Sequence, residues 1–410
     1  MNTYLIIILV ILIGSYFMDL IVETLNLKNI NPELPGEFEG YYEPEKYRKS
    51  QEYLEENTRF DLISSTILTP ITIAFIIFGG FNMVDKFARS LELGSIFTGL
   101  VFAGILMLAS QIIHIPFSIY DTFVIEERYG FNKTTPKTFI LDILKSWLLA
   151  VIIGGVVLSA VLWFFEKAGS LAWLYCWGAV TLFQLFMMFI APVVIMPIFN
   201  KFTPIEEGDL KGEIEEYAKA QGFKMRGVFT MDGSRRSSKS NAFFTGLGRF
   251  RRIVLFDTLI ERHSKEELVS ILAHEVGHYK KKHILQSFLI SVITMGLMFY
   301  ILSLFINNTG LFAAFGMEKT SIYASLVFFG FLYSPIEMIL SIFGNALSRK
   351  NEYQADAFAV KTYKKPGAFI EAIKKLAVEN LSNLAPHPLK VFLEYSHPPI
   401  IERIREVRSL

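Results

Sequence analysis

The residues best suited to chemistry lie in a short stretch past the middle of the chain. His274 and His278 are four positions apart, and Glu275 follows the first of them. On a helix this spacing places both imidazoles on one face, one turn apart, so that both can reach a single metal ion. The adjacent carboxylate can reach an attacking water molecule, an arrangement typical of zinc-dependent hydrolysis. A pair of solvated histidines on an amphipathic helix is the alternative that the motif alone leaves open.

A third metal ligand is available later in the chain. Glu352 and Asp356 are four positions apart, and Asn345 lies two turns earlier on the same helix face, with Arg349 beside it. A carboxylate from a second helix would complete a two-histidine, one-glutamate zinc site with one position left open. We therefore predict one zinc ion per chain, held by His274, His278 and Glu352. An ordinary surface helix could show the same spacing.

The histidine motif requires a well-defined helix, and the sequence before it predicts one. Ser264 followed by Glu267 forms a capping box, which marks a helix start. Leu268, Ile271 and Leu272 then continue with helical periodicity. His283 follows too late to join the site, because on an uninterrupted helix it would face about 140–180° away from the two motif histidines. We do not assign it to the metal.

The composition places these helices in a membrane protein. Apolar residues make up 52% of the 410 positions and charged residues only 19%, whereas soluble domains average roughly a quarter charged. About 20 apolar residues are needed to cross a bilayer. The sequence predicts seven such spans, the first read as a retained helix and not a signal peptide: 4–25, 60–81, 96–119, 146–165, 170–196, 284–306 and 321–346.

Charge and cysteine content exclude several other classes. The net charge is +1, from 40 basic and 39 acidic residues, so the chain has no bulk attraction to nucleic acid. The single cysteine, Cys176, cannot form an intramolecular disulfide or a cysteine-rich zinc site. The apolar composition makes a lipid bilayer an expected partner. Nothing in the sequence indicates an oligomeric state.

The loops between the spans predict an orientation. Alternate loops carry 35 Lys and Arg on one side against 4 on the other, or 8 against 4 for the short loops alone. The positive-inside rule puts the richer side, which includes the histidine motif, in the cytoplasm and the N-terminus opposite. His278 precedes the sixth span and Glu352 follows the seventh. Two crossings separate them, so both emerge on the same side of the membrane.

We divide the chain into four parts. Residues 1–199 hold spans 1–5, 200–283 form a soluble segment with the histidine motif, 284–346 hold spans 6 and 7, and 347–410 form a mostly helical C-terminal segment. The soluble segment is predicted to contain a helix and three strands, the last two joined by a hairpin turn at Thr245-Gly-Leu-Gly248: helix 206–221 and strands 226–231, 241–244 and 252–256. Prolines 366, 386, 388, 398 and 399 should interrupt the C-terminal helices.

Four stretches together resemble the type I CAAX prenyl endopeptidases, which are integral-membrane zinc metalloproteases. They are His274-Glu-Val-Gly-His278, the segment Asn345 to Asp356, Ser396-His397-Pro-Pro with Glu402-Arg403, and Asp232 to Ala242. The resemblance extends from about residue 30 to the C-terminus. It implies a mainly α, polytopic fold in which about seven tilted helices enclose a water-filled chamber, with a soluble α+β zincin-like zinc domain. It also implies cleavage of prenylated C-terminal C-a-a-X peptides.

The resemblance and the residue types together suggest catalytic roles. Glu275 is the expected general base, and Asp356 either a second catalytic acid or a group that orients a ligand imidazole. His397 and Arg403 would lie by the scissile carbonyl and meet the developing oxyanion, although His397 could instead cap the helix after Pro399. The extended run Asn241-Ala242-Phe243 would bind substrate by adding it as a strand.

Two other functions remain open at this stage. One is a membrane quality-control metalloprotease, which the seven spans disfavour because such relatives have fewer. The other is a metal-bound transporter or scaffold without hydrolysis, which would have no need of Glu275. The last residues carry no endoplasmic reticulum retrieval signal, so we expect a bacterial inner membrane more than an endoplasmic reticulum membrane.

Overall fold

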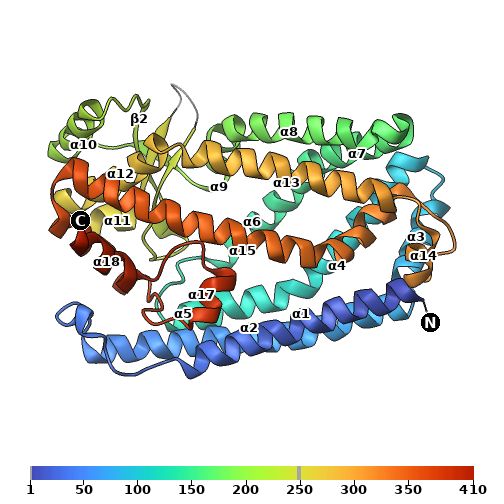
Figure 1. Ribbon diagram of the computed structural model, residues 1–410, viewed down its shortest axis with the longest axis horizontal. Coiled ribbons are helices and arrows are strands. Elements are labelled where there is room, and N and C mark those ends of the chain that lie inside the picture. Colours follow the sequence, from blue (N-terminus) through green and yellow to red (C-terminus); the bar gives the residue numbers. More distant parts are fainter. Residues whose placement is uncertain (1, 247–250) are drawn as a thin grey trace.

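The protein is a long, mainly helical molecule with a small sheet at one end (Figure 1). The computed structural model describes residues 2–246 and 251–410. Within these residues seven helical segments are long and apolar enough to cross a membrane, and they match the expected spans in order. The segments are Thr3–Lys28, Pro44–Ile77, Ser95–Arg128, Pro136–Lys167, Gly169–Phe199, His283–Phe305 and Ile322–Tyr363.

Four spans are single helices and three are composite. The single helices are α1 (Thr3–Lys28), α2 (Pro44–Ile77), α13 (His283–Phe305) and α15 (Ile322–Tyr363). The composite spans each contain one π-helical turn, a local widening that is frequent near functional sites. They join α4 (Ser95–Tyr120) to α5 (Glu126–Arg128), α6 (Pro136–Leu149) to α7 (Gly155–Lys167), and α8 (Ala172–Ile190) to α9 (Met196–Phe199). The short helices α3 (Gly80–Ser90) and α14 (Thr309–Ala314) lie at the end of the molecule opposite the sheet (Figure 1).

The apolar stretches of the spans bury little of their surface against the rest of the protein. Only 6% to 17% of the most apolar window of each span is buried within the protein. A packed bundle would bury one face of every helix. The expected mainly α, polytopic class, with seven spans and a soluble α+β part, is confirmed. The first span belongs to this set: α1 packs along α2 (Figure 1), and the Asn308 side chain donates to the Tyr4 hydroxyl at 2.7 Å.

The soluble part contains a four-stranded sheet among the described residues, in the order β1-β2-β4-β3. β2 and β4 are parallel and the other pairs antiparallel. β2, β3 and β4 confirm the three expected strands to within a residue or two, and the hairpin turn at Leu247-Gly248 lies outside the described residues. β1 was not anticipated, because it is only three residues long and includes a proline. The strands are β1 (Phe202–Pro204), β2 (Gly227–Met231), β3 (Ala242–Thr245) and β4 (Arg252–Phe256).

Segments far apart in the sequence build the core around this sheet. Phe38, Tyr42 and Tyr47, which follow the first span, pack with the sheet, the soluble helices and the C-terminal helices. Glu37 pairs with Lys374 at 2.6 Å and with Arg408 at 2.7 Å, which ties the same loop to the tail. The C-terminal helices begin at or directly after expected prolines: α16 (Pro366–Glu379), α17 (Pro388–Glu394) and α18 (Ile400–Ser409). The helices of the soluble part are α10 (Asp209–Ala220), α11 (Asp257–Arg262) and α12 (Lys265–Lys280).

Candidate active site

The H-E-x-x-H motif lies on α12, whose start is anchored as the sequence predicts. The Ser264 hydroxyl accepts from the Glu267 N–H at 3.3 Å, and the Glu267 carboxylate accepts from the Ser264 N–H at 3.0 Å. Lys375 of α16 pairs with the same carboxylate at 2.6 Å. The capping box therefore satisfies the first amides of the helix and also joins it to the C-terminal segment.

α12 packs directly against α15 through the glycine inside the motif. A Cβ at Gly277 would lie 3.0 Å from the Ala355 Cα and 3.1 Å from its carbonyl oxygen. A side chain would push the helices apart, so glycine is needed for this close approach. Glu352 lies almost one turn before Ala355 on α15. The same approach therefore brings its carboxylate to the motif histidines.

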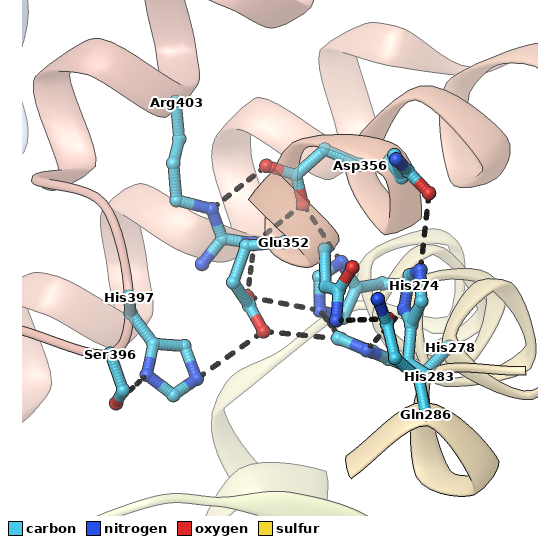
Figure 2. Close-up of polar contacts among 11 residues, drawn as sticks. His274, His278, His283, Gln286, Glu352, Asp356, Ser396, His397 and Arg403 are labelled. Atoms are coloured by element: carbon cyan, nitrogen blue, oxygen red, sulfur yellow. Dashed lines mark hydrogen bonds and ion pairs between the residues drawn. The ribbon is translucent and has the colours of Figure 1, made fainter. Parts of the chain in front are cut away.

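Figure 2 shows the three expected metal ligands facing one another. The Nε2 atoms of His274 and His278 are 3.0 Å apart. Glu352 Oε2 lies 3.4 Å from His274 Nε2, and Glu352 Oε1 lies 3.2 Å from His278 Nε2. One ligand atom from each residue falls within 4.8 Å of the others. Two imidazoles from α12 and a carboxylate from α15 thus converge on one point.

The chemistry of these donors fits a divalent metal. His274 Nδ1 lies 2.8 Å from Asp356 Oδ1, so the imidazole proton resides on Nδ1 and the Nε2 lone pair points toward His278 and Glu352. Two imidazole nitrogens and a carboxylate directed at one point form a donor set that can bind a divalent cation. Two histidines and one glutamate are also the ligand set of hydrolytic zinc sites that keep one position open.

Asp356 and Arg403 form a second layer behind the ligands (Figure 2). Asp356 is fully buried. The Arg403 guanidinium donates two hydrogen bonds to its carboxylate, of 2.8 and 2.6 Å. Arg403 also lies 3.7 Å from Glu352. The resemblance suggests Arg403 beside the scissile carbonyl, and in the structure its donors are directed at these two carboxylates. It is not among the residues that line the cavity described below.

A cavity of about 630 Å³ opens in front of the three ligands. Its walls come from α8, β3, α12, α13 and α15, and from the segment before α18 that carries His397. His274, Glu275, His278 and Glu352 all contribute to its surface. A peptide that entered this cavity would therefore meet the metal ligands and the adjacent carboxylate together.

Glu275 and strand β3 border the same cavity. The backbone of Phe244 hydrogen-bonds the Glu275 carboxylate, and burial raises the pKa of this group against the opposing effect of the two histidines. Phe243 and Phe244 pair with β4 on one side and reach the cavity. β3 ends the strand order, so its second edge pairs with no strand in residues 2–246 and 251–410.

The stretch that leads into β3 is fastened to the membrane helices. Arg236 pairs with Asp142 of α6 at 2.8 Å and donates to the Phe199 carbonyl at 2.7 Å. Lys239 pairs with Glu126 of α5 at 3.1 Å. The Asn241 side chain accepts from its neighbour's amide, the Ala242 N–H, at 2.8 Å. The stretch that contains these residues therefore holds the start of β3 in place relative to the spans.

His397 reaches the site from the loop before α18. Its Nε2 lies 3.5 Å from Glu352 Oε1, and its Nδ1 contacts the Ser396 hydroxyl at 3.0 Å (Figure 2). Arg349 holds the preceding chain by donating to the carbonyls of Val391 and Tyr395 at 3.0 and 2.5 Å. The position of Arg349 on the ligand-bearing face of α15, noted from the sequence, is explained by this contact.

His283 is a site neighbour that the helical spacing placed on the wrong side. α12 ends at Lys280, and Lys282 adopts a left-handed conformation with φ of 59°. The chain is thereby redirected before α13 starts at His283. As a result, His283 Nδ1 lies 3.0 Å from His278 Nδ1 (Figure 2). The expectation that it faces away assumed an uninterrupted helix. Residue 283 still falls outside the three-residue ligand group.

The chain is similar to known proteins over nearly its whole length. Residues 23–201 match the family described as CAAX prenyl protease N-terminal, five membrane helices, and residues 204–410 match peptidase family M48. The protein named CAAX prenyl protease 1 homolog of Arabidopsis thaliana is 37% identical, with 96% of each chain covered. CAAX prenyl protease 1 of Saccharomyces cerevisiae is 35% identical over 91% of this chain and 88% of its own.

A solved structure shares the same arrangement. The crystal structure of S. mikatae Ste24p superposes with a TM-score of 0.95 at 32% identity, and 99% of each chain is covered. These relatives are eukaryotic, which does not favour the bacterial inner membrane expected from the sequence. The family implies a bound metal, in agreement with the converging histidines and glutamate. The chain belongs to peptidase family M48 and is a multi-pass membrane metalloendopeptidase.

Proposed function

We propose that the protein is a zinc-dependent endopeptidase that cleaves prenylated C-terminal C-a-a-X peptides inside its membrane chamber. The observation that carries the proposal is the convergence of His274, His278 and Glu352 beside Glu275 and an unpaired strand edge. The printed names of the relatives, CAAX prenyl proteases, support the substrate class. The metal is proposed as one zinc ion per chain, because the two-histidine, one-glutamate set is typical of catalytic zinc.

In this proposal Glu275 moves the protons. When bound, zinc supplies Lewis-acid polarisation of the scissile carbonyl and acidifies the attacking water. Glu275 lies next to the first ligand and lines the cavity. Its raised pKa, caused by burial, makes it a stronger base toward that water and a suitable donor to the leaving amine afterwards. The Phe244 amide keeps the carboxylate turned toward the cavity.

The substrate backbone would lie along β3. The open edge of β3 along Asn241, Ala242 and Phe243, where the Ala242 carbonyl faces away from β4, would receive an extended peptide as a further strand. Asn241 stands at the start of this edge. The peptide would then run past the ligands with its scissile bond between β3 and His397, whose exposed ring faces the metal side of the cavity. His397 is proposed as the donor to the developing oxyanion.

Arg403 and Asp356 act through the ligands in this proposal. Asp356 holds the Nδ1 proton of His274 and so keeps Nε2 free for the metal. Arg403 neutralises the buried Asp356 and lies near Glu352. We therefore assign Arg403 a positioning role and leave the oxyanion to His397. Asp356 is assigned the orienting role and not that of a second acid, because both its oxygens are already engaged.

The soluble part and the C-terminal segment are proposed to face the cytoplasm, with the N-terminus opposite. The excess of 35 Lys and Arg against 4 in alternate loops supports this orientation. In Figure 1 the sheet and α18 lie at one end of the spans, and the N-terminus lies at the other. A prenylated protein made in the cytoplasm would then meet the site on the side where it is synthesised.

A paired-substrate assay tests the function. Purified protein in detergent or lipid discs is offered a farnesylated C-a-a-X peptide and the same peptide without the lipid, before and after chelation of the metal. We expect zinc-dependent cleavage of the farnesylated peptide within its last four residues. Equal cleavage of both peptides and of unrelated unfolded membrane segments would favour a quality-control protease. Bound zinc with no cleavage of any peptide would favour the transporter or scaffold.

A further inference from the structure

His283 is a buried imidazole that the proposed mechanism does not use. Only 4% of its surface is exposed. It lies at the first position of α13, while the metal ligands lie on α12 and α15. Figure 2 shows its ring beside His278 and away from the point where the three ligands meet. A buried imidazole retains two polar nitrogens that must both find partners.

Both nitrogens of His283 have such partners. Nδ1 lies 3.0 Å from His278 Nδ1, and Nε2 lies 3.2 Å from the Gln354 side-chain oxygen on α15. The Gln354 oxygen can only accept, so the His283 proton resides on Nε2. His283 Nδ1 is then an acceptor with a lone pair directed at His278 Nδ1. For that contact to be a hydrogen bond, His278 must carry its proton on Nδ1.

This chain of contacts determines which nitrogen of His278 is free. A proton on Nδ1 leaves the lone pair on Nε2, and His278 Nε2 is the atom that faces His274 and Glu352. The two ligand histidines are therefore oriented by different groups. His274 has a carboxylate partner, Asp356, whereas His278 has a neutral imidazole supported by an amide.

We propose that His283, fixed by Gln354, is the positioning residue that holds His278 in its metal-binding tautomer and ring orientation. The inference rests on the metal site of the proposed function. It gives a reason for the change of chain direction at Lys282, a non-glycine residue with φ of 59°: the left-handed residue places His283 against His278. Partners of this kind typically change metal affinity or activity by about 10–100-fold when removed.

The neighbouring pair supplies a matched control. One turn further along α13, Gln286 accepts from the Asn351 side chain of α15 at 3.1 Å. This bond joins the same two helices as the His283–Gln354 contact but touches no metal ligand. Gln286→Leu therefore reproduces the loss of an α13–α15 hydrogen bond. It leaves the partner of His278 intact.

The experiment measures zinc affinity of the metal-free full-length protein by competition with a chromogenic chelator. His283→Leu should weaken zinc binding about 10–100-fold. His283→Asn should stay close to the unaltered protein, because the Asn Oδ1 occupies the place of Nδ1 and can accept the same proton. Gln286→Leu should match the unaltered protein. Substituted with Co²⁺, His283→Leu should show a shifted ligand-field absorption band, whereas the Asn and Gln286 variants should not.

Other outcomes overturn the inference. One is a zinc affinity of His283→Leu within two- to threefold of that of the unaltered protein. A second is an equal loss of zinc affinity in His283→Leu and His283→Asn. A third is an equal loss in His283→Leu and Gln286→Leu. If His283→Leu does not fold, Gln354→Leu replaces it, since that change frees the His283 proton and should also weaken binding. If the unaltered protein does not bind zinc at all, the proposed function is contradicted. The role of His283 is contradicted only by the comparison of zinc affinities between the variants.

Discussion

Gly277 on α12 and Ala355 on α15 are separated by no side chain: a Cβ on the glycine would lie 3.0 Å from the Ala355 Cα. This contact sets the spacing between the helix that supplies two metal ligands and the helix that supplies the third. Gly277 lies between Glu275 and His278 in the motif. The residue that allows the close packing of the two helices is therefore part of the segment that carries the metal ligands. The distance between two backbones thus determines whether Glu352 reaches the histidines.

Gly277→Ala should therefore weaken the metal site. The added methyl group forces α12 and α15 apart, at a cost of about 1–3 kcal/mol for overpacking, and draws Glu352 away from His274. We expect a lower melting temperature and a lower zinc content by elemental analysis. Gly344→Ala on α15 is the control, because a Cβ there meets nothing within 4 Å and should be neutral or slightly stabilising. Equal behaviour of the two variants would contradict the packing argument.

Glu352→Gln should lower the zinc content sharply with little change of fold. The amide keeps the volume of the side chain but is a poor zinc ligand, and it sits where the carboxylate now faces both Nε2 atoms. Elemental analysis of the purified variant measures the loss, and thermal unfolding serves as the control for folding. Full retention of zinc would show that another group, with Asp356 the first suspect, is the third ligand.

Glu275→Gln should separate metal binding from catalysis. The three ligands are untouched, so zinc should stay, and the glutamine can still accept from the Phe244 amide. The proton acceptor for the attacking water is lost, and general-base catalysis is worth about 10²–10⁴-fold. Cleavage of a farnesylated C-a-a-X peptide should fall by at least that order while the peptide still binds. Near-normal cleavage with full zinc would refute the peptidase mechanism.

Zinc affinity should rise with pH across neutrality. Burial would lower the pKa of His274, but the carboxylates of Asp356 and Glu352 outweigh it and raise this pKa to about 9 in the metal-free protein. Below pH 9 the imidazole therefore holds an extra proton that zinc must displace. Affinity should drop by about tenfold for each unit of pH lost between 9 and 7. Calorimetry in two buffers of different ionisation enthalpy measures the proton released on zinc binding. A zinc affinity that does not change between pH 7 and 9 would contradict the displacement of a proton from His274.

Cysteine labelling tests the proposed orientation. In a Cys176→Ser background, single cysteines at Lys219 and Lys361 should react with a membrane-impermeant reagent from the same side. Both positions are exposed. Lys219 follows the fifth span, and Lys361 lies near the end of the helix that contains the seventh. A cysteine at Lys319, exposed between α14 and α15, should label from the opposite side. Labelling of Lys219 and Lys361 from opposite sides would remove a span and break the site.

Much of the site could be predicted because its parts are local. His274, Glu275 and His278 lie within a single turn of one helix, whose start is set by the capping box of Ser264 and Glu267. Helical geometry alone then places the two imidazoles together. The spans follow from the need to keep about 20 apolar residues out of water. The two crossings between His278 and Glu352 follow from counting these spans.

Other features depend on contacts between distant segments. The resemblance suggested Arg403 beside the scissile carbonyl, which stays untested, and the approach of α18 to α15 directs its guanidinium at Asp356. Helical spacing turned His283 away from the site, but the left-handed Lys282 turns it back. Neither outcome could be read from periodicity, because the first requires the packing of the tail and the second requires a single backbone torsion.

The sequence by itself determined which residues could bind a metal, which helix carries the first two, and that the third emerges on the same side of the membrane as these two. Residue type, helical period and hydropathy are properties of a local stretch, so they need no knowledge of the fold. The tertiary structure decided the distance between α12 and α15, the partners of the two ligand histidines and the walls of the cavity. These depend on which surfaces meet in space, and a close contact such as that of Gly277 with Ala355 exists only after distant segments have packed together.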